Sequence, residues 1–490
     1  MSKKVVIVGT GNAALCAALA ALEQGAEVTL LEKADEDLAG GNTKYTAGAM
    51  RFAYDGSADL LPLVRDQNDP RLGRTDFGQY PQSKFADDLM KFNGGRDLSS
   101  EQRRLISQSL PTMTWLASHG VTFEPIWSRQ SFERDGQIVF WGGLTLAAEN
   151  EGVGLFEMER DAVLQLGGKI RYGAKVDGLL TDGSRVTGVR VGDAAIAADA
   201  VILACGGFEA DPDLREAWMG GNWRTAKVRG TPHNTGDGLR LALDLGAKRR
   251  GLYDGCHATP MDLHMAEYGG LHLPPIERKN FRKICYFLGV MLNAQGERFV
   301  DEGKDFRNYT YAQFGRAVLD QPGHFAWQVF DAKVEPLLYA EYRFREAHFV
   351  EADSLEALVR KLDGVAADAA LDTLYAFNGA VDTETAFDPT VLDGKGATGL
   401  PVPRSNWAQV LDTPPFRAYP VTGGITFTYG GLAVSDRGAV LNEADAEIPG
   451  LFACGEMVGG VFYEGYPGGS GLTSGAVFGR LAGSHAGADG

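Results

Sequence analysis

Residues 4–33, KVVIVGTGNAALCAALAALEQGAEVTLLEK, decide the fold. Four β-branched residues at 5–8 predict a buried strand, and the Ala/Leu-rich stretch from Asn12 to Gln24 predicts a helix. The second apolar run, at 26–33, predicts another strand. Between the first strand and the helix, Gly9, Gly11 and Ala14 follow the G-x-G-x-x-G/A spacing of a dinucleotide-binding βαβ unit. The segment therefore predicts a Rossmann-type α/β fold rather than an ordinary glycine turn.

Each of these small residues has a physical role in such a unit. Gly9 permits a tight turn, Gly11 lets a pyrophosphate approach the backbone, and Ala14 is small enough for the helix to pack on the strand. The helix N-terminus offers unpaired N–H groups and a positive dipole end to a phosphate. Glu32 ends the second strand, where a carboxylate would accept hydrogen bonds from an adenosine ribose and disfavour a 2′-phosphate. NADP is therefore the ligand that this site fits least.

Length and charge narrow the class of protein. A chain of 490 residues is too long for one hydrophobic core and predicts two or three domains. Its 47 Lys and Arg residues against 64 Asp and Glu residues give a net charge of −17, which argues against a nucleic-acid partner. The 64 glycines suit a backbone that must pass close to a bulky cofactor.

The cysteines argue against metal centres. Cys16, Cys205, Cys256, Cys285 and Cys454 are widely spaced and contain no CxxC or CxxCH pattern, so we expect buried reduced thiols, no metal site and no c-type haem. A signal peptide is disfavoured, because residues 9–12 interrupt the apolar stretch that follows the first lysines. No run reaches the ~20 apolar residues of a transmembrane helix. We expect a cytoplasmic protein, with peripheral membrane attachment left open.

Pattern changes along the chain predict three segments. Residues 1–255 form the first part of the cofactor domain and include a β-meander over 169–208 and a second glycine-rich turn at 231–247. Residues 256–411 are less regular, contain a helical stretch near 354–365, and predict an inserted domain. Residues 412–490 return to the glycine-rich pattern, with a strand near 448–454 and a helix from Gly469. Glycine-lined helix starts at both ends of the chain imply a cofactor held from two sides.

Eight motifs, in order along nearly the whole chain, resemble the fumarate reductase/succinate dehydrogenase flavoprotein superfamily. They are GTGNAALCAALAA (9–21), LLEK (30–33), GGNTKYTAGAM (40–50), ILACGGF (202–208), NTGDGLRLALDLGA (234–247), NAQGERFVDE (293–302), GGITFTYGGLAV (423–434) and IPGLFACGEMVGG (448–460). Within that superfamily, the stretches at 40–56, 227–239, 301–315 and 466–469 look closest to FAD-dependent tricarballylate dehydrogenases.

The resemblance implies FAD on a two-dinucleotide-binding Rossmann-type domain of α/β class, with an inserted α+β capping domain that closes substrate against the flavin. The residues carried over as cofactor-binding are Gly9, Gly11, Asn12, Ala14, Glu32, Lys33, Gly40, Gly41, Asn42, Thr43, Ala47, Gly48, Gly206, Asp237, Glu456, Gly471 and Leu472. The helix after Gly469 would direct its positive end at the flavin N1–C2=O edge. Thr43 stands where covalently flavinylated members have histidine, so we expect noncovalent FAD.

For catalysis, the resemblance implies that Arg307 exchanges a proton with a substrate carbon while hydride passes to or from flavin N5. Arginine is a costly base because its pKa exceeds 12, and burial among positive charges would lower that pKa. The alternative is that Arg307 only binds a carboxylate. His257 matches a family histidine that binds a substrate carboxylate, although a lone histidine is often structural.

Two positions depart from the fumarate reductase pattern. Thr426 and Phe427 stand where a histidine is found, and Tyr466 stands where an arginine is found. The Tyr-Pro-Gly-Gly turn at 466–469 is similar instead to 3-ketosteroid dehydrogenases, in which the tyrosine polarises a carbonyl. Replacement positive charge could come from Arg229, Arg282 and Arg307, whereas Arg249, Arg250 and Lys279 are expected on a solvated face.

The leading hypothesis is an FAD-dependent dehydrogenase that desaturates a C–C bond next to a carboxylate, as tricarballylate to cis-aconitate. Electrons would leave to a separate acceptor, such as a membrane or iron–sulfur partner protein, because the chain has no haem or iron–sulfur ligand set. The alternatives are a 3-ketosteroid-type dehydrogenase and an enoate reductase working in the opposite direction. A further hypothesis is a flavin-binding structural or partner protein that catalyses no reaction. The presence of Arg307, the candidate acid/base residue, is evidence against this hypothesis.

Overall fold

The computed structural model describes residues 2–128 and 130–488, and the chain divides into two compact units. The described part of unit 1 comprises residues 2–128, 130–219, 230–256 and 427–488, and unit 2 comprises residues 220–229 and 257–426. Strand β20 (Phe416–Thr428) carries the chain from unit 2 back into unit 1. Segment 220–229 belongs to unit 2, although the sequence pattern did not set it apart from its neighbours.

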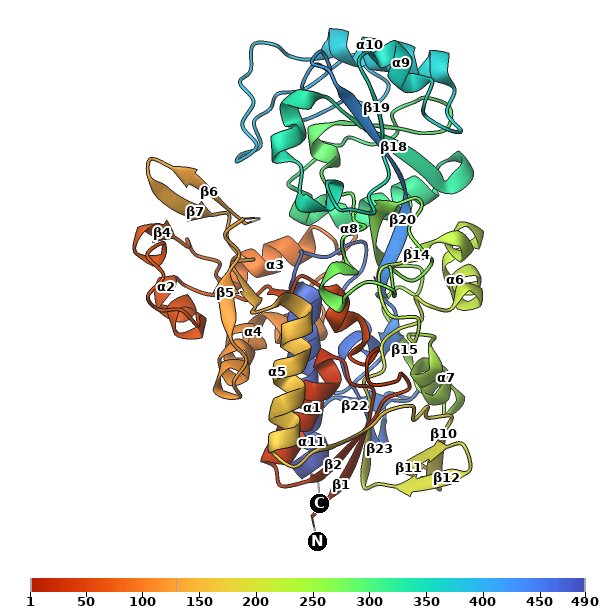
Figure 1. The fold of residues 1–490 in the computed structure, drawn as a ribbon. Coiled ribbons are helices and arrows are strands. Elements are labelled where there is room, and N and C mark those ends of the chain that lie inside the picture. Colours follow the sequence, from red (N-terminus) through yellow and green to blue (C-terminus); the bar gives the residue numbers. More distant parts are fainter. Residues whose placement is uncertain (1, 129, 489–490) are drawn as a thin grey trace. The chain divides into compact units, whose positions relative to one another are not determined.

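A six-stranded sheet forms the centre of unit 1 (Figure 1). Its order is β22-β23-β13-β1-β2-β9, and every neighbouring pair is parallel except β22 with β23. The strands are β1 (Lys4–Val8), β2 (Glu27–Leu31), β9 (Lys169–Arg171), β13 (Ala200–Leu203), β22 (Ala439–Leu441) and β23 (Glu447–Ala453). The β-branched run at 5–8 is buried, as parallel strands covered on both faces require. The predicted βαβ unit is therefore present, with β1 central.

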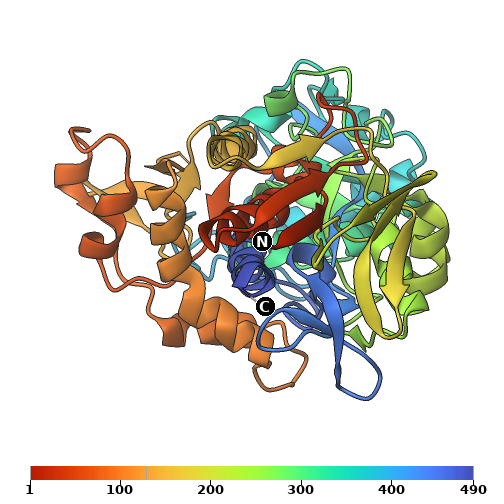
Figure 2. The same cartoon turned by 90° about the horizontal axis from the view of Figure 1, so that it is seen from below.

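Helix α11 (Ser470–Ala488) runs alongside α1 (Asn12–Glu23), as Figures 1 and 2 show. The contact is made by glycines spaced four residues apart on α11, which lie on one helical face. An added Cβ at Gly479 would lie 2.4 Å from the Ala13 carbonyl oxygen, and one at Gly483 would lie 2.1 Å from the Ala17 carbonyl oxygen. Only glycine permits backbones to come this close.

The rest of unit 1 surrounds this centre. Two longer helices, α4 (Ser100–Ser118) and α5 (Glu151–Gln165), pack against α11 and α1 respectively. The three-stranded meander consists of β10 (Gly178–Asp182), β11 (Arg185–Val191) and β12 (Ala194–Ala197). The strand at 169–171, which the sequence suggested as part of the meander, instead pairs with β2 in the main sheet. The smaller elements are β3 (Ala49–Met50), α2 (Ser57–Leu60), β4 (Thr75–Asp76), α3 (Gln82–Met90), β5 (Phe123–Pro125), β6 (Ser131–Arg134), β7 (Gln137–Phe140), β8 (Leu146–Ala148), α6 (Pro212–Met219), α7 (Asp237–Asp244), β15 (Arg249–Arg250) and β21 (Gly431–Leu432).

Unit 2 is built around β20. This strand pairs in parallel with β14 (Lys227–Val228) and antiparallel with β18 (Phe325–Phe330) and β19 (Val350–Ala352). β16 (Cys256–Asp262) also pairs with β20, and β17 (Val290–Leu292) pairs with β18. The helices are α8 (Arg307–Leu319), α9 (Leu355–Val359) and α10 (Ala367–Ala380), so the helix expected near 354–365 ends early, at Val359.

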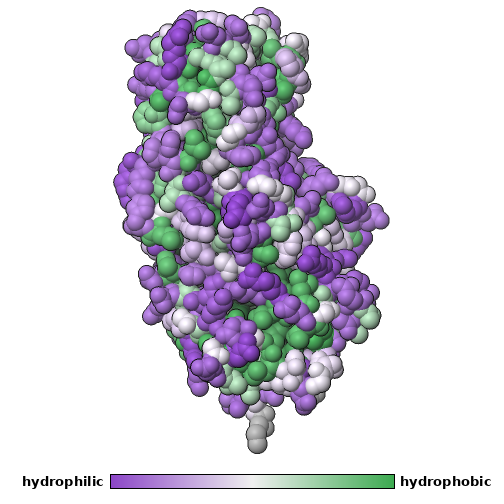
Figure 3. All heavy atoms as spheres, turned by 90° about the vertical axis from the view of Figure 1, so that its right-hand side faces the viewer, coloured by the Kyte–Doolittle hydropathy of each residue, from purple (hydrophilic) through white to green (hydrophobic). Residues whose placement is uncertain are grey.

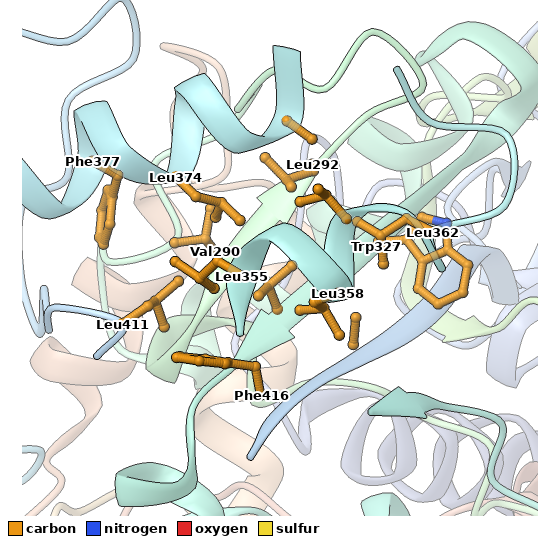
Figure 4. Packing of buried hydrophobic residues seen from close by; sticks show 14 of the residues in the cluster. Val290, Leu292, Trp327, Leu355, Leu358, Leu362, Leu374, Phe377, Leu411 and Phe416 are labelled. Atoms are coloured by element: carbon orange, nitrogen blue, oxygen red, sulfur yellow. The ribbon is translucent and has the colours of Figure 1, made fainter. Parts of the chain in front are cut away.

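Unit 2 has its own hydrophobic core. Figure 4 shows side chains from β17, β18, α9 and α10 that point into one cluster. Leu358, Leu374 and Leu292 in this cluster are completely buried. Because each unit buries a separate set of apolar side chains, the two units are distinct in packing as well as in chain order.

The surface is mixed in character. Figure 3 shows one face, on which hydrophilic residues predominate and apolar residues gather mainly in the lower part of the view. Among exposed large apolar side chains, Leu166 and Leu392 are 50% and 48% exposed and lie on different units. None of the helices over 2–128 and 130–488 combines the length and apolar character that a bilayer crossing requires.

The glycine contact between α1 and α11 gives a stability prediction. Gly483→Ala should lower the free energy of unfolding by about 1–3 kcal/mol, because the new methyl group overlaps the Ala17 carbonyl and forces the helices apart. The matched control is Gly379→Ala on α10, where an added Cβ meets no atom within 4 Å. This control should gain up to about 1 kcal/mol from helix propensity. Urea unfolding measures both, and wild-type stability for Gly483→Ala would contradict the proposed contact.

Candidate active site

The two glycines of the first turn, Gly9 and Gly11, differ in whether the fold itself requires glycine. Gly9 has φ +108°, and a Cβ there would lie 2.5 Å from the Ala204 carbonyl oxygen. Gly11 has φ −70°, and a Cβ there would meet nothing closer than 3.5 Å. The fold therefore requires glycine at position 9 but not at position 11. Gly11 directly precedes α1, whose N-terminal N–H groups suit a phosphate group.

Glu32 is fixed by two donors at the end of β2. The hydroxyl of Thr10 donates to one carboxylate oxygen, and the Ala34 amide donates to the other at 2.8 Å. Thr10 Oγ1 also accepts a hydrogen bond from the Gly40 amide at 3.1 Å, so it joins the first glycine turn to the second. The sequence motif specifies only the small residues of the turn, and sequence analysis therefore missed Thr10.

The N-termini of α1 and α11 are joined directly. The Asn12 amide donates to Thr43 Oγ1 at 3.0 Å, and the Asn12 side chain donates to the Leu472 carbonyl oxygen at 2.8 Å. A Cβ at Gly471 would meet no atom closer than 3.6 Å, so this glycine, like Gly11, is not required by packing within unit 1. Two helix N-termini with open glycines thus lie together, as the sequence predicted for a ligand held from both sides.

Several other predicted cofactor residues serve the surrounding loops. Gly40 (φ +102°) and Gly48 (φ +65°) adopt left-handed backbone, and a Cβ at either would collide with α5. Gly41 (φ +54°) begins the short helix η1 (Gly41–Tyr45). Ala47 is half-buried next to Gly48, and Ala14 is completely buried in the α1 interface.

A third loop is held by Lys33. Its ammonium group donates to Thr235 Oγ1 and to Asp237 Oδ2, each at 2.7 Å. Asp237 is the first residue of α7, and Gly206 (φ +76°) packs against Asn234 in the same loop. The predicted residues Lys33 and Asp237 therefore form an ion pair that connects β2 to α7.

Glu456 lies beside a second acid, Glu209, that sequence analysis missed. Thr428 donates its amide and its hydroxyl to Glu456 Oε1 at 2.6 and 2.9 Å. Glu209 is completely buried, and its Oε1 accepts hydrogen bonds from the side chains of Asn42 and Asn234, each at 2.6 Å. Burial raises the pKa of both carboxyl groups. The only sequence signal for Glu209 was its place directly after GGF at 206–208.

Tyr466 lies in an aromatic group within unit 1. Its ring is perpendicular to that of Phe427, with centroids 5.3 Å apart, and lies edge-on to Phe462 at 5.4 Å. Tyr429 completes the group through contacts with the same two phenylalanines. Phe427 and Tyr466, the two departures from the fumarate reductase pattern, therefore pack on each other.

In unit 2, His257 is completely buried on β16, with its ring edge-on to Tyr311 at 5.0 Å. Burial, and then the charges of Arg229 and Arg282, hold the pKa of His257 well below its ordinary value. Arg229 donates through Nε to Thr426 Oγ1 at 2.9 Å, and Arg282 pairs with Glu341 at 2.6 Å. The imidazole is thus neutral at pH 7 in a positively charged environment.

Arg307 is the first residue of α8 and is half-buried. Its guanidinium lies 5.3 Å from the ring centre of Tyr339 and 5.9 Å from that of Tyr311. Burial lowers its pKa, but Tyr339, Tyr311 and Tyr286 together outweigh burial, so the pKa lies above its ordinary value. The expected lowering by positive neighbours is therefore wrong, and Arg307 is a firmly held cation.

Two further expectations also need correction. Lys279, expected on a solvated face, is 5% exposed, because its ammonium group turns inward and donates to the Ile276 carbonyl oxygen at 2.8 Å. Cys205, expected to be buried, is partly exposed beside Met457. In the described ranges, no three His, Cys, Asp or Glu side chains are grouped closely enough to hold a metal ion.

The sequence model of the family described as FAD binding domain matches residues 4–472. The chain belongs to this family. It is 28% identical over 490 residues to the fumarate reductase (cytochrome) of Shewanella frigidimarina. The alignment covers 98% of this chain and 76% of the Shewanella protein. A flavocytochrome c3 fumarate reductase in its open conformation matches with TM-score 0.73 and 25% identity, over 99% of this chain and 78% of that one. The 3-ketosteroid Δ1-dehydrogenase of Sterolibacterium denitrificans shares the fold, with TM-score 0.73, 20% identity and full coverage of both chains.

These matches confirm the predicted fold and cofactor class. The protein is an FAD-dependent oxidoreductase similar in sequence to fumarate reductases, with the α/β FAD-binding fold that the sequence predicted. The paired helix N-termini, with Gly11 and Gly471 where packing does not require glycine, fit a dinucleotide cofactor. The assignment of individual site residues, and tricarballylate as substrate, stay predictions.

The two glycines of the first turn give a cofactor prediction. Gly11→Ala should leave the melting temperature of the apoprotein unchanged, because a Cβ there meets only ordinary van der Waals neighbours. It should weaken FAD binding by about 5- to 150-fold, the effect of about 1–3 kcal/mol of overpacking against a close phosphate. Gly9→Ala should destabilise the apoprotein itself. FAD fluorescence quenching and thermal unfolding separate the two effects, and undiminished FAD affinity in Gly11→Ala would contradict a pyrophosphate at this turn.

Proposed function

We propose that the protein interconverts a saturated carboxylic acid and its α,β-unsaturated counterpart, with tricarballylate and cis-aconitate as the pair that the sequence resemblance suggests. The observation that carries this proposal is the cationic group of unit 2. Buried Arg229 and Arg282 act on the neutral imidazole of His257, and Glu341 is paired to Arg282. Half-buried Arg307 contacts the ring of Tyr311, which His257 also contacts. Such a group attracts a substrate with several negative charges. We also propose that unit 2 is the capping, substrate-binding domain of this enzyme.

The residues of this group have different chemical capacities. Arg229 and Arg282 are buried guanidinium groups, which suit bidentate binding of carboxylates. Neutral His257 can donate one hydrogen bond without adding charge. Bound FAD supplies the site that accepts or donates hydride. Arg307, held protonated, is suited to give a proton to the carbon next to the activating group.

The state of Arg307 favours a second candidate, reduction of an enoate. In the desaturating direction this group must first lose its proton, which the neighbouring tyrosines oppose. In the reducing direction the protonated guanidinium is already the required donor. A ketone substrate is the third candidate, and it is supported by Tyr466 in the Phe427–Phe462 aromatic group, where a hydroxyl could polarise a carbonyl. Electrons are exchanged with a separate partner or acceptor in each case.

We propose that the FAD is held noncovalently. Thr43 occupies the position of the attachment histidine of covalent members, and its hydroxyl is engaged by the Asn12 amide. Acid precipitation of the holoprotein should therefore release a yellow supernatant that mass spectrometry identifies as FAD. Flavin that stays with the pellet would contradict this proposal.

Arg307→Lys tests the proton-transfer role. The variant keeps FAD and positive charge, but loss of a positioned acid should lower kcat by about 10²–10⁴-fold. A residue that only binds a carboxylate would instead raise KM and leave kcat nearly unchanged. Arg316→Lys is the matched control, because Arg316 lies on the same helix and stacks on Trp223. It should keep normal kinetics.

The same assay distinguishes the substrate classes. Anaerobic reaction of oxidised holoprotein with saturated acids, and of reduced holoprotein with enoates, should show a flavin absorbance change with polycarboxylates and none with 3-ketosteroids. Tyr466→Phe should be the milder change for a polycarboxylate, whose binding does not use the hydroxyl. Rapid turnover of a 3-ketosteroid, abolished by Tyr466→Phe, would overturn the carboxylate proposal in favour of the ketone.

A further inference from the structure

Glu209 is a buried acid at the junction of three loops of unit 1. It follows β13 and is completely shielded from solvent. Its Oε1 accepts hydrogen bonds from the amide groups of Asn42, in η1, and Asn234, in the loop before α7. One carboxyl oxygen therefore fastens two loops that contain predicted cofactor residues.

Glu456 extends this connection to a fourth segment. It lies in η10 (Gly455–Met457), and its Oε1 accepts both hydrogen bonds from Thr428 at the end of β20. A Cβ at Gly207 would lie 2.2 Å from Glu456 Oε1, so the carboxyl group fits only because residue 207 is glycine. Glu456 Oε1 therefore lies against Gly207, two residues before Glu209, and the charge of Glu456 raises the pKa of Glu209 further after burial has raised it.

The pair needs a proton to be stable. Glu209 Oε2 is buried and receives no hydrogen bond from a donor group, and within residues 2–128 and 130–488 neither acid forms an ion pair with a lysine or arginine. Two adjacent buried carboxylates repel each other strongly, whereas one shared proton makes Glu209 a donor to Glu456. A single proton therefore satisfies the buried oxygen and removes the repulsion.

The charged and titratable groups on the surrounding elements do not neutralise the carboxyl groups of Glu209 and Glu456 in place of that proton. Arg215 on α6 donates to the main-chain oxygen of Glu209, at 2.5 Å, rather than to its carboxyl group. Lys33 is paired with Asp237, and burial and the charge of Lys33 hold the pKa of His233 below its ordinary value, so this imidazole is neutral. Desolvation of the Cys205 sulfur, beside Met457, raises its pKa to about 12, so this partly exposed residue stays a neutral thiol.

We propose that Glu209 is a positioning residue for the cofactor, and that Glu209 and Glu456 share one proton that keeps the FAD-binding loops closed. In this form Glu209 donates through Oε2 to Glu456 while Oε1 holds Asn42 and Asn234. Loss of the proton places two buried carboxylates side by side and loosens the loops. FAD affinity is then constant below the apparent pKa of the pair and falls as pH rises above it, by about tenfold per pH unit for a single linked proton.

Glu209→Gln tests the proposal, because glutamine copies the protonated acid. Its oxygen can accept from Asn42 and Asn234, and its NH₂ group can donate to Glu456 at every pH. FAD titration of apoprotein between pH 6 and pH 10 should give wild-type affinity near pH 7 and no decline at high pH. Glu209→Leu, which keeps the volume but no hydrogen bond, should bind FAD weakly throughout.

The matched control is Glu159→Gln on α5. Glu159 is also completely buried with a raised pKa, but its partner is the Cys16 thiol, outside the pair. This variant should keep the wild-type decline in FAD affinity. A decline in Glu209→Gln equal to that of the wild type, or a wild type with no decline up to pH 10, would overturn the proposal.

A spectroscopic measurement keeps the test decisive if a variant folds poorly. Infrared difference spectra of the wild-type holoprotein should contain a protonated carboxylic acid band that disappears as FAD affinity falls. The Glu159→Gln variant, which removes the other buried acid with a raised pKa, should keep this band, and the double variant Glu159→Gln/Glu209→Gln should lack it. Absence of such a band at pH 7 in Glu159→Gln would overturn the shared proton. All readouts follow cofactor binding, so the result does not depend on the substrate or direction of the reaction.

Discussion

The close backbone contact between α1 and α11 is the constraint on which the cofactor site depends. Gly479 and Gly483 place the α11 backbone against Ala13 and Ala17 of α1, with no side chain between them. This separation lets the Asn12 side chain reach the Leu472 carbonyl oxygen, across 460 positions of sequence. Two positive helix ends are therefore held together by contacts within the chain, and such preorganisation reduces the cost of binding a pyrophosphate and flavin.

The buried groups around Glu209 in unit 1 and around His257 in unit 2 differ in charge. In unit 1, buried acids such as Glu209 lie among amide and hydroxyl donors, so burial favours their neutral form. In unit 2, buried arginines retain their charge because their pKa values are far above neutrality, and His257 gives up its proton instead. The first arrangement avoids negative charge in the cofactor loops, and the second concentrates positive charge for an anionic substrate.

Local sequence patterns predicted those parts of the fold that are determined by residues close together in the sequence. The βαβ unit, the glycine turns and the C-terminal helix follow from small residues and apolar runs within short windows. Partners distant in sequence could not be predicted this way. Segment 220–229 joins unit 2, Glu209 meets Glu456, and Lys279 turns inward to a main-chain oxygen, each because of contacts that only the folded chain brings together. Thr10 shows a third limit, because a motif that specifies only small residues leaves its neighbours unspecified.

Unit 1 is built from segments on both sides of unit 2 in the sequence, and this order has a consequence for biosynthesis. Unit 2 is contained within residues 220–426, whereas unit 1 also needs β22, β23 and α11. On the ribosome, unit 2 can therefore complete its core while the alanine face of α1 and the β13 edge still lack their partners. Unit 1 closes only after α11 emerges, so the nascent chain exposes an apolar helix face and an unpaired strand edge for most of its synthesis. Such surfaces are the ones that chaperones bind.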